Sequence, residues 1–250
     1  MKRVALPLLS LFLGALLLGA VRKSTHTVAT PSGARHDGIS AGSIARAIGS
    51  VNLDPRHPRD DDRAEVMRRL KDGERTTYIN EIIEERDSAL CRWPDRGGVP
   101  LSVWIQPHAN VKDFEHGYVQ SVHDAFDEWD DVHLPVRFAF VDDSAEADVH
   151  VNFIDHFKEA ISGRTRWARD DDYAITDANI ILAIHHNQGD QLDTDAMRAM
   201  ALHEIGHLLG LDHTKDTLSI MAPRVRIRQL AAQDRATARL LYALPAGPIR

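Results

Sequence analysis

Residues 203–213 read His-Glu-Ile-Gly-His-Leu-Leu-Gly-Leu-Asp-His, and this stretch decides the fold that we predict for the chain. On an α-helix His203 and His207 lie one turn apart on the same face, so both imidazoles can reach one metal ion. Gly210 lets the chain leave the helix through a left-handed conformation, which returns His213 as a third nitrogen ligand. Three neutral imidazoles leave one position of a tetrahedral Zn²⁺ open, which is typical of a catalytic site.

The same stretch carries a candidate general base. Glu204 follows the first histidine, close enough to touch a water at the metal without being a ligand itself. Downstream comes the run Ser219-Ile220-Met221-Ala222-Pro223. A plainer interpretation is an amphipathic helix whose histidines face solvent, but it leaves Gly210, His213 and Met221 without a reason. We therefore predict a metal site.

These residues are similar to the metzincin zinc endopeptidases and, among them, to the matrixin family. Metzincins place a methionine in a tight turn beneath the metal, and Met221 matches it. Matrixins carry Ser or Thr after the third histidine, where this chain has Thr214, and they share the Met-x-Pro that ends in Pro223. The resemblance covers roughly residues 99–242. It implies an α+β fold with a twisted, mostly parallel sheet, an antiparallel edge strand, a long active-site helix, a Met turn and a C-terminal helix.

The resemblance also implies a function: a zinc-dependent endopeptidase with one catalytic Zn²⁺, Glu204 as general base and an extended peptide or protein as substrate. Pro223, Arg224 and Val225 are the candidate wall of the specificity pocket. Vertebrate relatives place a tyrosine after the proline, so their substrate preference does not transfer to this chain. The alternative function is a catalytically silent, zinc-containing peptide-binding module tethered at the membrane.

Four segments divide the chain. Residues 1–21 combine a basic start with an apolar run over 4–21, which predicts either a removable signal peptide or a retained membrane anchor. Residues 22–59 resemble a flexible tether, and residues 60–98 a helical arm that is a candidate pro-segment. Residues 99–245 form the expected catalytic domain. We expect the protein outside the cytoplasm, touching a membrane only through residues 4–21 if they are retained.

The periodicity of apolar residues predicts the elements of these segments. The expected helices cover residues 60–70, 76–90, 114–131, 194–209 and 234–242. The expected strands cover residues 99–105, 136–141, 148–153, 164–167 and 179–184. The last of these strands is expected at the sheet edge above the cleft, where its free backbone groups would bind a peptide as an added strand.

Charge and composition restrict the partners. The net charge is −7, and no dense basic run is interleaved with aromatic residues, so we expect no nucleic acid as a partner. The oligomeric state stays open.

Cys91 is the only cysteine, so no intrachain disulfide can form. It stands in a Cys-x-x-Pro-Asp context that resembles the latency switch of matrix metalloproteases, where a thiolate occupies the open metal position. The neighbouring residues Leu90 and Arg92 depart from the family pattern. An incidental cysteine leading into the sheet is the favoured interpretation.

Further metal sites have weaker signals. The run Asp170-Asp171-Asp172 is a candidate Ca²⁺ site, although such a run is more often a solvated loop. The remaining histidines near the predicted edge strand lack the His-x-Asp spacing of the second zinc site of vertebrate relatives. We expect them to be surface or core histidines: His150, His156, His185 and His186.

Overall fold

The computed structural model describes residues 60–86 and 88–249, and in it the histidine motif lies on a helix that packs against a five-stranded sheet. The strands are β2 (Leu101–Ile105), β3 (Phe138–Phe140), β4 (Val149–Ile154), β5 (Gly163–Arg169) and β6 (Ile175–Ala183). They follow the order β3-β2-β4-β6-β5, in which β5 is antiparallel to β6 and all other neighbours are parallel. The expected mostly parallel sheet with an antiparallel edge strand is confirmed. The predicted signal or anchor (1–21) and tether (22–59) lie outside the described residues.

Alternation of side chains along the strands builds the core. In β2, Leu101 and Val103 are fully buried, and in β4 so are Val149 and Val151, whereas the residues between them are only partly covered. Successive side chains of a strand point to opposite faces, so the fully buried set marks the face of the sheet that is covered by helices.

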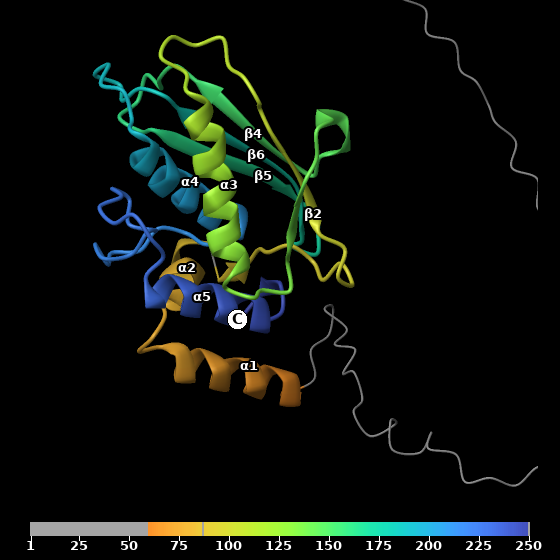
Figure 1. The fold of residues 1–250 in the computed structure, drawn as a ribbon. Helices are drawn as coiled ribbons and strands as arrows, with labels where there is room; N and C mark the ends of the chain where they lie inside the picture. Colours follow the sequence, from red (N-terminus) through yellow and green to blue (C-terminus); the bar gives the residue numbers. More distant parts are fainter. Residues whose placement is uncertain (1–59, 87, 250) are drawn as a thin grey trace, which may run out of the picture. The chain divides into compact units, whose positions relative to one another are not determined.

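Two long helices lie side by side on that face (Figure 1). They are α3 (His116–Asp130) and α4 (Thr194–Leu208). The indole of Trp129 on α3 donates a hydrogen bond of 2.9 Å to the carbonyl of Leu202 on α4, which fixes the two helices in register. The short 3-10 helix η2 (Ser144–Glu146) precedes β4. Among the helices of the described segments, none has the length and apolar character needed to cross a bilayer.

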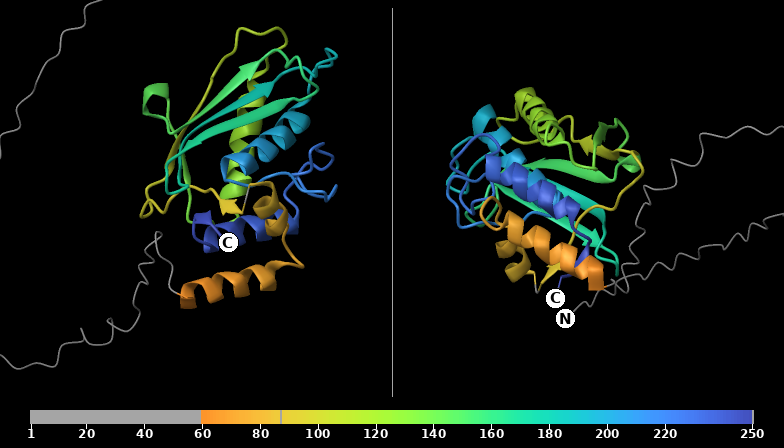
Figure 2. Two further views of the ribbon diagram at one scale, coloured as in Figure 1. Left: turned by 180° about the vertical axis from the view of Figure 1, so that it is seen from behind. Right: turned by 90° about the horizontal axis from the view of Figure 1, so that it is seen from below.

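The N-terminal arm packs beneath the sheet on the C-terminal helix (Figures 1 and 2). The elements of this layer are α1 (Asp60–Gly73), α2 (Ile79–Glu85), β1 (Ala89–Leu90), α5 (Ala232–Ala243) and β7 (Gly247–Pro248). Strand β1 pairs antiparallel with β7, so the arm and the C-terminal part of the described chain form one two-stranded sheet. Ile79 and Ile82 of α2 are fully buried.

Two expectations about elements are wrong. The helix expected over 76–90 is confined to Ile79–Glu85, because the chain turns at Ser88 with a φ of 68° and Ala89–Leu90 then pairs with β7. Residues 179–184 do not form the sheet edge. They lie within β6 and the residues after it, and β6 pairs with β4 on one side and β5 on the other. The edge strand is β5, whose expected range of 164–167 extends to Gly163–Arg169. Both errors concern pairing between distant segments, which local periodicity does not encode.

Candidate active site

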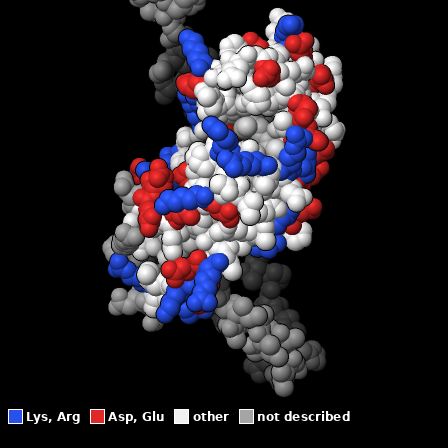
Figure 3. Space-filling view, turned by 90° about the vertical axis from the view of Figure 1, so that its left-hand side faces the viewer, with Lys and Arg blue, Asp and Glu red and all other residues white. Residues whose placement is uncertain are grey.

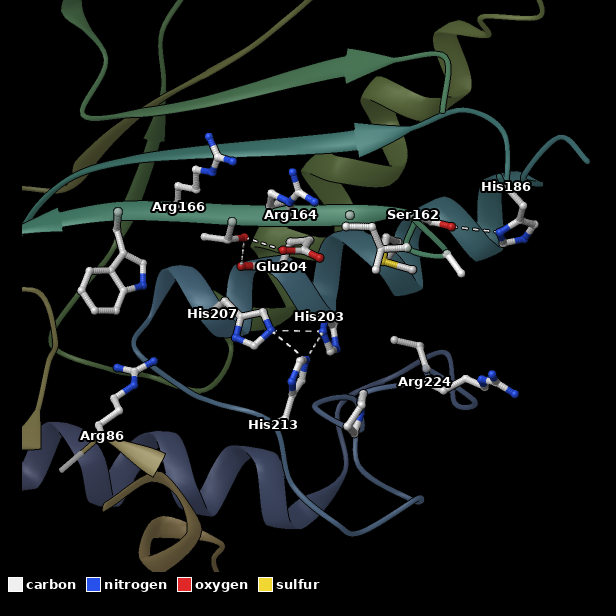
Figure 4. Close-up of a pocket in the computed structure, with 18 residues that line it drawn as sticks. Arg86, Ser162, Arg164, Arg166, His186, His203, Glu204, His207, His213 and Arg224 are labelled. Carbon is white, nitrogen blue, oxygen red and sulfur yellow. Dashed lines mark hydrogen bonds between the residues drawn. The ribbon is translucent and has the colours of Figure 1, made fainter. Parts of the chain in front are cut away.

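Three imidazole nitrogens form a nearly equilateral triangle at the end of α4 (Figure 4). The Nε2 atom of His207 lies 3.2 Å from that of His203 and 3.3 Å from that of His213, and the third side is 3.3 Å. A tetrahedral zinc with Zn–N bonds of about 2.0–2.1 Å requires nitrogen separations of about 3.3 Å. Within the described residues this is the one group of His, Cys, Asp or Glu whose ligand atoms gather closely enough to hold a metal ion. The donor set therefore fits zinc.

Backbone carbonyls set the tautomers of two of these rings. Nδ1 of His203 lies 2.7 Å from the carbonyl oxygen of Ile220, and Nδ1 of His207 lies 3.1 Å from that of Leu211. A carbonyl can only accept, so each Nδ1 carries the proton and each Nε2 presents a lone pair. Burial lowers the pKa of His203 to about 4, which keeps this ring neutral at physiological pH.

The helix presents the histidines because both of its ends are well defined. Asp193 caps the N-terminus by accepting a hydrogen bond from the backbone N–H of Ala196 at 2.6 Å. At the other end Gly210 has a φ of +95°, and the N–H of Leu211 bonds to the carbonyl of Gly206 at 2.9 Å. A Cβ at Gly210 would lie 2.2 Å from the carbonyl oxygen of Cys91. Both the positive φ and this close approach therefore require glycine at the position.

Glu204 lies against the edge strand. It is 3% exposed, and burial raises the pKa of its carboxyl group to about 7, while the hydroxyl of Thr165 opposes the rise by donating to Oε2 at 2.6 Å. Gly163 leaves room for the carboxylate, because a Cβ there would lie 2.4 Å from Oε1. Two residues of β5 thus hold Glu204 beside the histidines (Figure 4).

Met221 lies fully buried under the metal-binding end of α4. Its sulfur packs on Gly206, where a Cβ would lie 2.3 Å from Sδ. The turn around Met221 is held by Asp234, a fully buried residue of α5 whose carboxylate accepts from the N–H of Ile220 at 3.0 Å and from the hydroxyl of Ser219. The carbonyl of Ile220 accepts the hydrogen bond from Nδ1 of His203. Asp234 therefore acts on the metal site through this turn.

A cleft of about 1120 Å³ opens in front of the histidines and Glu204. Its upper wall in Figure 4 is β5, and the opposite wall includes the three residues named as candidate pocket wall, Pro223, Arg224 and Val225. Arg86, from the end of α2, also lines the cleft; it pairs with Asp212 at 2.9 Å.

Other candidates are placed elsewhere. The structure does not bring Cys91 to the histidines: its side chain belongs to the hydrophobic core, where burial raises the pKa of the thiol. The carboxylate of Asp170 accepts hydrogen bonds from the backbone N–H groups of Asp172 and Ala174 and so stabilises the turn after β5. Calcium binding at this turn stays a prediction.

The four histidines that the sequence analysis assigned to the surface or core also have partners. His186 lines the cleft, 2.9 Å from the hydroxyl of Ser162. His185 is buried and lies 2.7 Å from Asp155, which His156 also contacts. His150 lies 2.8 Å from the carbonyl of Ser144.

Sequence reasoning missed four residues of this site: Gly163, Thr165, Arg86 and Asp234. No local signal identifies the first three. Asp234 had a weak one, because an aspartate in the first turn of a helix is a common cap.

A protein-family model described as Matrixin matches residues 105–243. The matched segment runs from the end of β2 to the end of α5 and contains the three histidines, Glu204 and Met221. It covers more than half of the 250-residue chain. No curated protein matches the chain.

Proposed function

Because the chain belongs to the matrixin family of zinc metalloproteases, we propose that it is an endopeptidase that cleaves extended peptide segments. The observation that carries this proposal is the triangle of Nε2 atoms with the Glu204 carboxylate beside it, open to one cleft. His203, His207 and His213 would hold Zn²⁺. When bound, the ion supplies Lewis acidity, which activates a water molecule and polarises the scissile carbonyl.

Glu204 performs the proton transfers. Thr165 occupies Oε2, which leaves Oε1 to accept the proton of the attacking water and to return a proton to the leaving amine. Burial raises the pKa of this carboxyl above its ordinary value, which favours acceptance of the proton from the water. Met221 takes no part in the chemistry and keeps the floor beneath the imidazoles dry.

The free edge of β5 orients the substrate. In the described part of the chain this strand pairs with β6 alone, so the backbone groups of its other edge are available to an extended peptide. Addition of a strand fixes the peptide by main-chain hydrogen bonds and leaves specificity to the side chains. We propose further that the enzyme works outside the cytoplasm, on the basis of the basic and apolar pattern of residues 1–21.

The test compares the zinc-loaded full-length protein with its Glu204→Gln variant on a denatured protein substrate. We expect the variant to keep one zinc by metal analysis and to lose activity by about 10²–10⁴-fold, the range of general acid–base catalysis. Glu74→Gln, an exposed glutamate before α2, is the matched control. Activity of the Glu204 variant within tenfold of wild type would refute the general-base role. Tight peptide binding without cleavage by either protein would favour the silent peptide-binding module.

A further inference from the structure

The cleft is strongly basic, although the chain carries a net charge of −7. Four arginines line it, against a single carboxylate, that of Glu204, which the proposed reaction uses. The arginines come from separate parts of the chain: Arg86 from the end of α2, Arg164 and Arg166 from β5, and Arg224 from the loop after Met221. This excess of positive charge at the substrate cleft favours a negatively charged ligand.

Two of these arginines have no ion-pair or hydrogen-bond partner among residues 60–86 and 88–249. Arg86 is engaged by Asp212 at 2.9 Å and lies over the ring of Trp167, and Arg164 reaches Glu159 at 3.2 Å. The side chains of Arg166 and Arg224 are exposed and make no hydrogen bond or ion pair with any described residue. Their guanidinium groups are therefore available to a ligand.

The chain as a whole is acidic, with a net charge of −7. On the face of the molecule in Figure 3, Lys and Arg side chains are interspersed with Asp and Glu, and neither sign covers the surface. A generally basic surface would attract any polyanion. A basic cleft in an acidic protein instead selects among the peptides that enter it.

The geometry of β5 indicates where the side chains of a bound peptide would lie. Arg164 and Arg166 are two residues apart in β5 and project from one face of the strand, away from the three histidines (Figure 4). A peptide that pairs with β5 places every second side chain on this face, with Cβ atoms about 4.5–5.5 Å from their opposite neighbours. Arg224 lies on the other wall of the cleft (Figure 4).

We propose, resting on the peptidase function above, that the cleft selects acidic peptides. Arg166, assisted by Arg164, pairs with aspartate or glutamate at alternate positions of the bound strand, and Arg224 pairs with an acidic side chain on the other face. Guanidinium groups bind carboxylates through two parallel hydrogen bonds, which adds geometric preference to the attraction of charge.

The experiment uses three peptide sets with one common cleavable core and flanks that are acidic, neutral (Asn and Gln) or basic. Zinc-loaded full-length protein should cleave the acidic set with the highest kcat/KM and the basic set with the lowest. Arg166→Gln and Arg224→Gln should each reduce the ratio of acidic to neutral kcat/KM by about two- to fivefold, the range of exposed charge pairs. The preference should shrink in 0.5 M NaCl. Arg75→Gln, an exposed arginine outside the cleft, should change nothing.

A binding measurement separates this inference from the peptidase proposal. The Glu204→Gln protein is titrated with the same fluorescent peptides, alone and combined with Arg166→Gln. Tighter binding of the acidic set, weakened by the second substitution, supports the inference whether or not cleavage occurs. Equal dissociation constants for acidic and neutral peptides, or no binding of any set, would overturn it. Failure of wild type to cleave any set would count against the peptidase proposal alone.

Discussion

At the scale of single residues, two small side chains on β5 decide where the Glu204 carboxylate lies. Gly163 leaves the space that Oε1 occupies, and Thr165 donates a hydrogen bond to Oε2. Neither residue belongs to the group of three histidines that would hold the metal. Their substitution should therefore affect proton transfer and leave metal binding intact.

We expect Gly163→Ala to lower kcat by at least tenfold while zinc content is unchanged. The added Cβ would lie 2.4 Å from Oε1 and 2.7 Å from Cγ of Glu204, so the side chain must move away from its position. The control is Gly98→Ala, where a Cβ meets nothing but φ is +85°. That variant should lose about 1 kcal/mol of stability and keep full activity. Unchanged kcat in Gly163→Ala would mean that Glu204 works from another position.

Thr165→Val should shift the acidic limb of the pH–rate profile to higher pH. The hydroxyl stabilises the charged form of Glu204, so its loss raises the pKa of that carboxyl further above its ordinary value. The carboxylate must be ionised to accept a proton, so activity falls as the pH drops through its pKa. With a higher pKa, this loss of activity begins at a higher pH. Thr165→Ser keeps the donor and should retain the wild-type profile. The two profiles are measured as kcat/KM between pH 5 and 9, and coincident acidic limbs would contradict the role given to Thr165.

At the scale of elements, the metal helix depends on neighbours that are distant in the sequence. The indole of Trp93 donates to the carbonyl of Leu208 at 3.0 Å, and the hydroxyl of Tyr242 donates to that of Leu209 at 3.1 Å. The last carbonyls of a helix have no partner within it. The N-terminal arm and α5 thus complete the end of α4 from which the chain leads to His213.

Asp234→Ala should lower the free energy of unfolding by more than 3 kcal/mol and weaken zinc binding. The substitution leaves buried donors without a partner, among them the N–H of Ile220 and the hydroxyl of Ser219, and each unsatisfied buried group costs about 1–3 kcal/mol. Chemical denaturation and zinc titration measure the two effects. Asp177→Ala, at an exposed position of β6, should show neither. Wild-type zinc affinity in the Asp234 variant would mean that the turn around Met221 does not support zinc binding.

At the scale of the whole molecule, the arm of residues 60–98 is packed as part of the domain. Seven of its large apolar side chains are buried: Leu70, Tyr78, Ile79, Ile82, Ile83, Leu90 and Trp93. Arg86 of the same arm lines the cleft and contacts Trp167 of β5. A removable pro-segment would have to give up these contacts, and its removal stays a prediction.

A fragment of residues 99–250 should therefore fail to fold. Burial of each large apolar side chain contributes roughly 1.5–3 kcal/mol, against a net stability of about 5–15 kcal/mol for a typical domain. Circular dichroism and thermal unfolding should show no cooperative transition in this fragment, whereas a fragment of residues 51–250 should keep one. A folded, zinc-binding fragment of residues 99–250 would instead support the pro-segment hypothesis.

The metal site and the fold class could be predicted because their signals are local. The spacing of His203, Gly210 and His213 depends on the helical repeat and on one left-handed residue, both properties of consecutive residues. The alternation of β2 and β4 and the apolar face of α3 are equally local. Resemblance to the matrixin pattern extended these signals to the mostly parallel sheet.

The position of the edge strand, the supports of Glu204 and the place of the arm were decided only by tertiary structure. Residues 179–184 have strong β character because β6 is buried between two strands. Strand β5 lies at the edge and is polar, so its sequence gives only a weak strand signal. Thr165 meets Glu204, Asp234 meets the Met turn and β1 meets β7 across long separations in the chain. Such contacts form when several elements pack together, and no pattern of neighbouring residues specifies them.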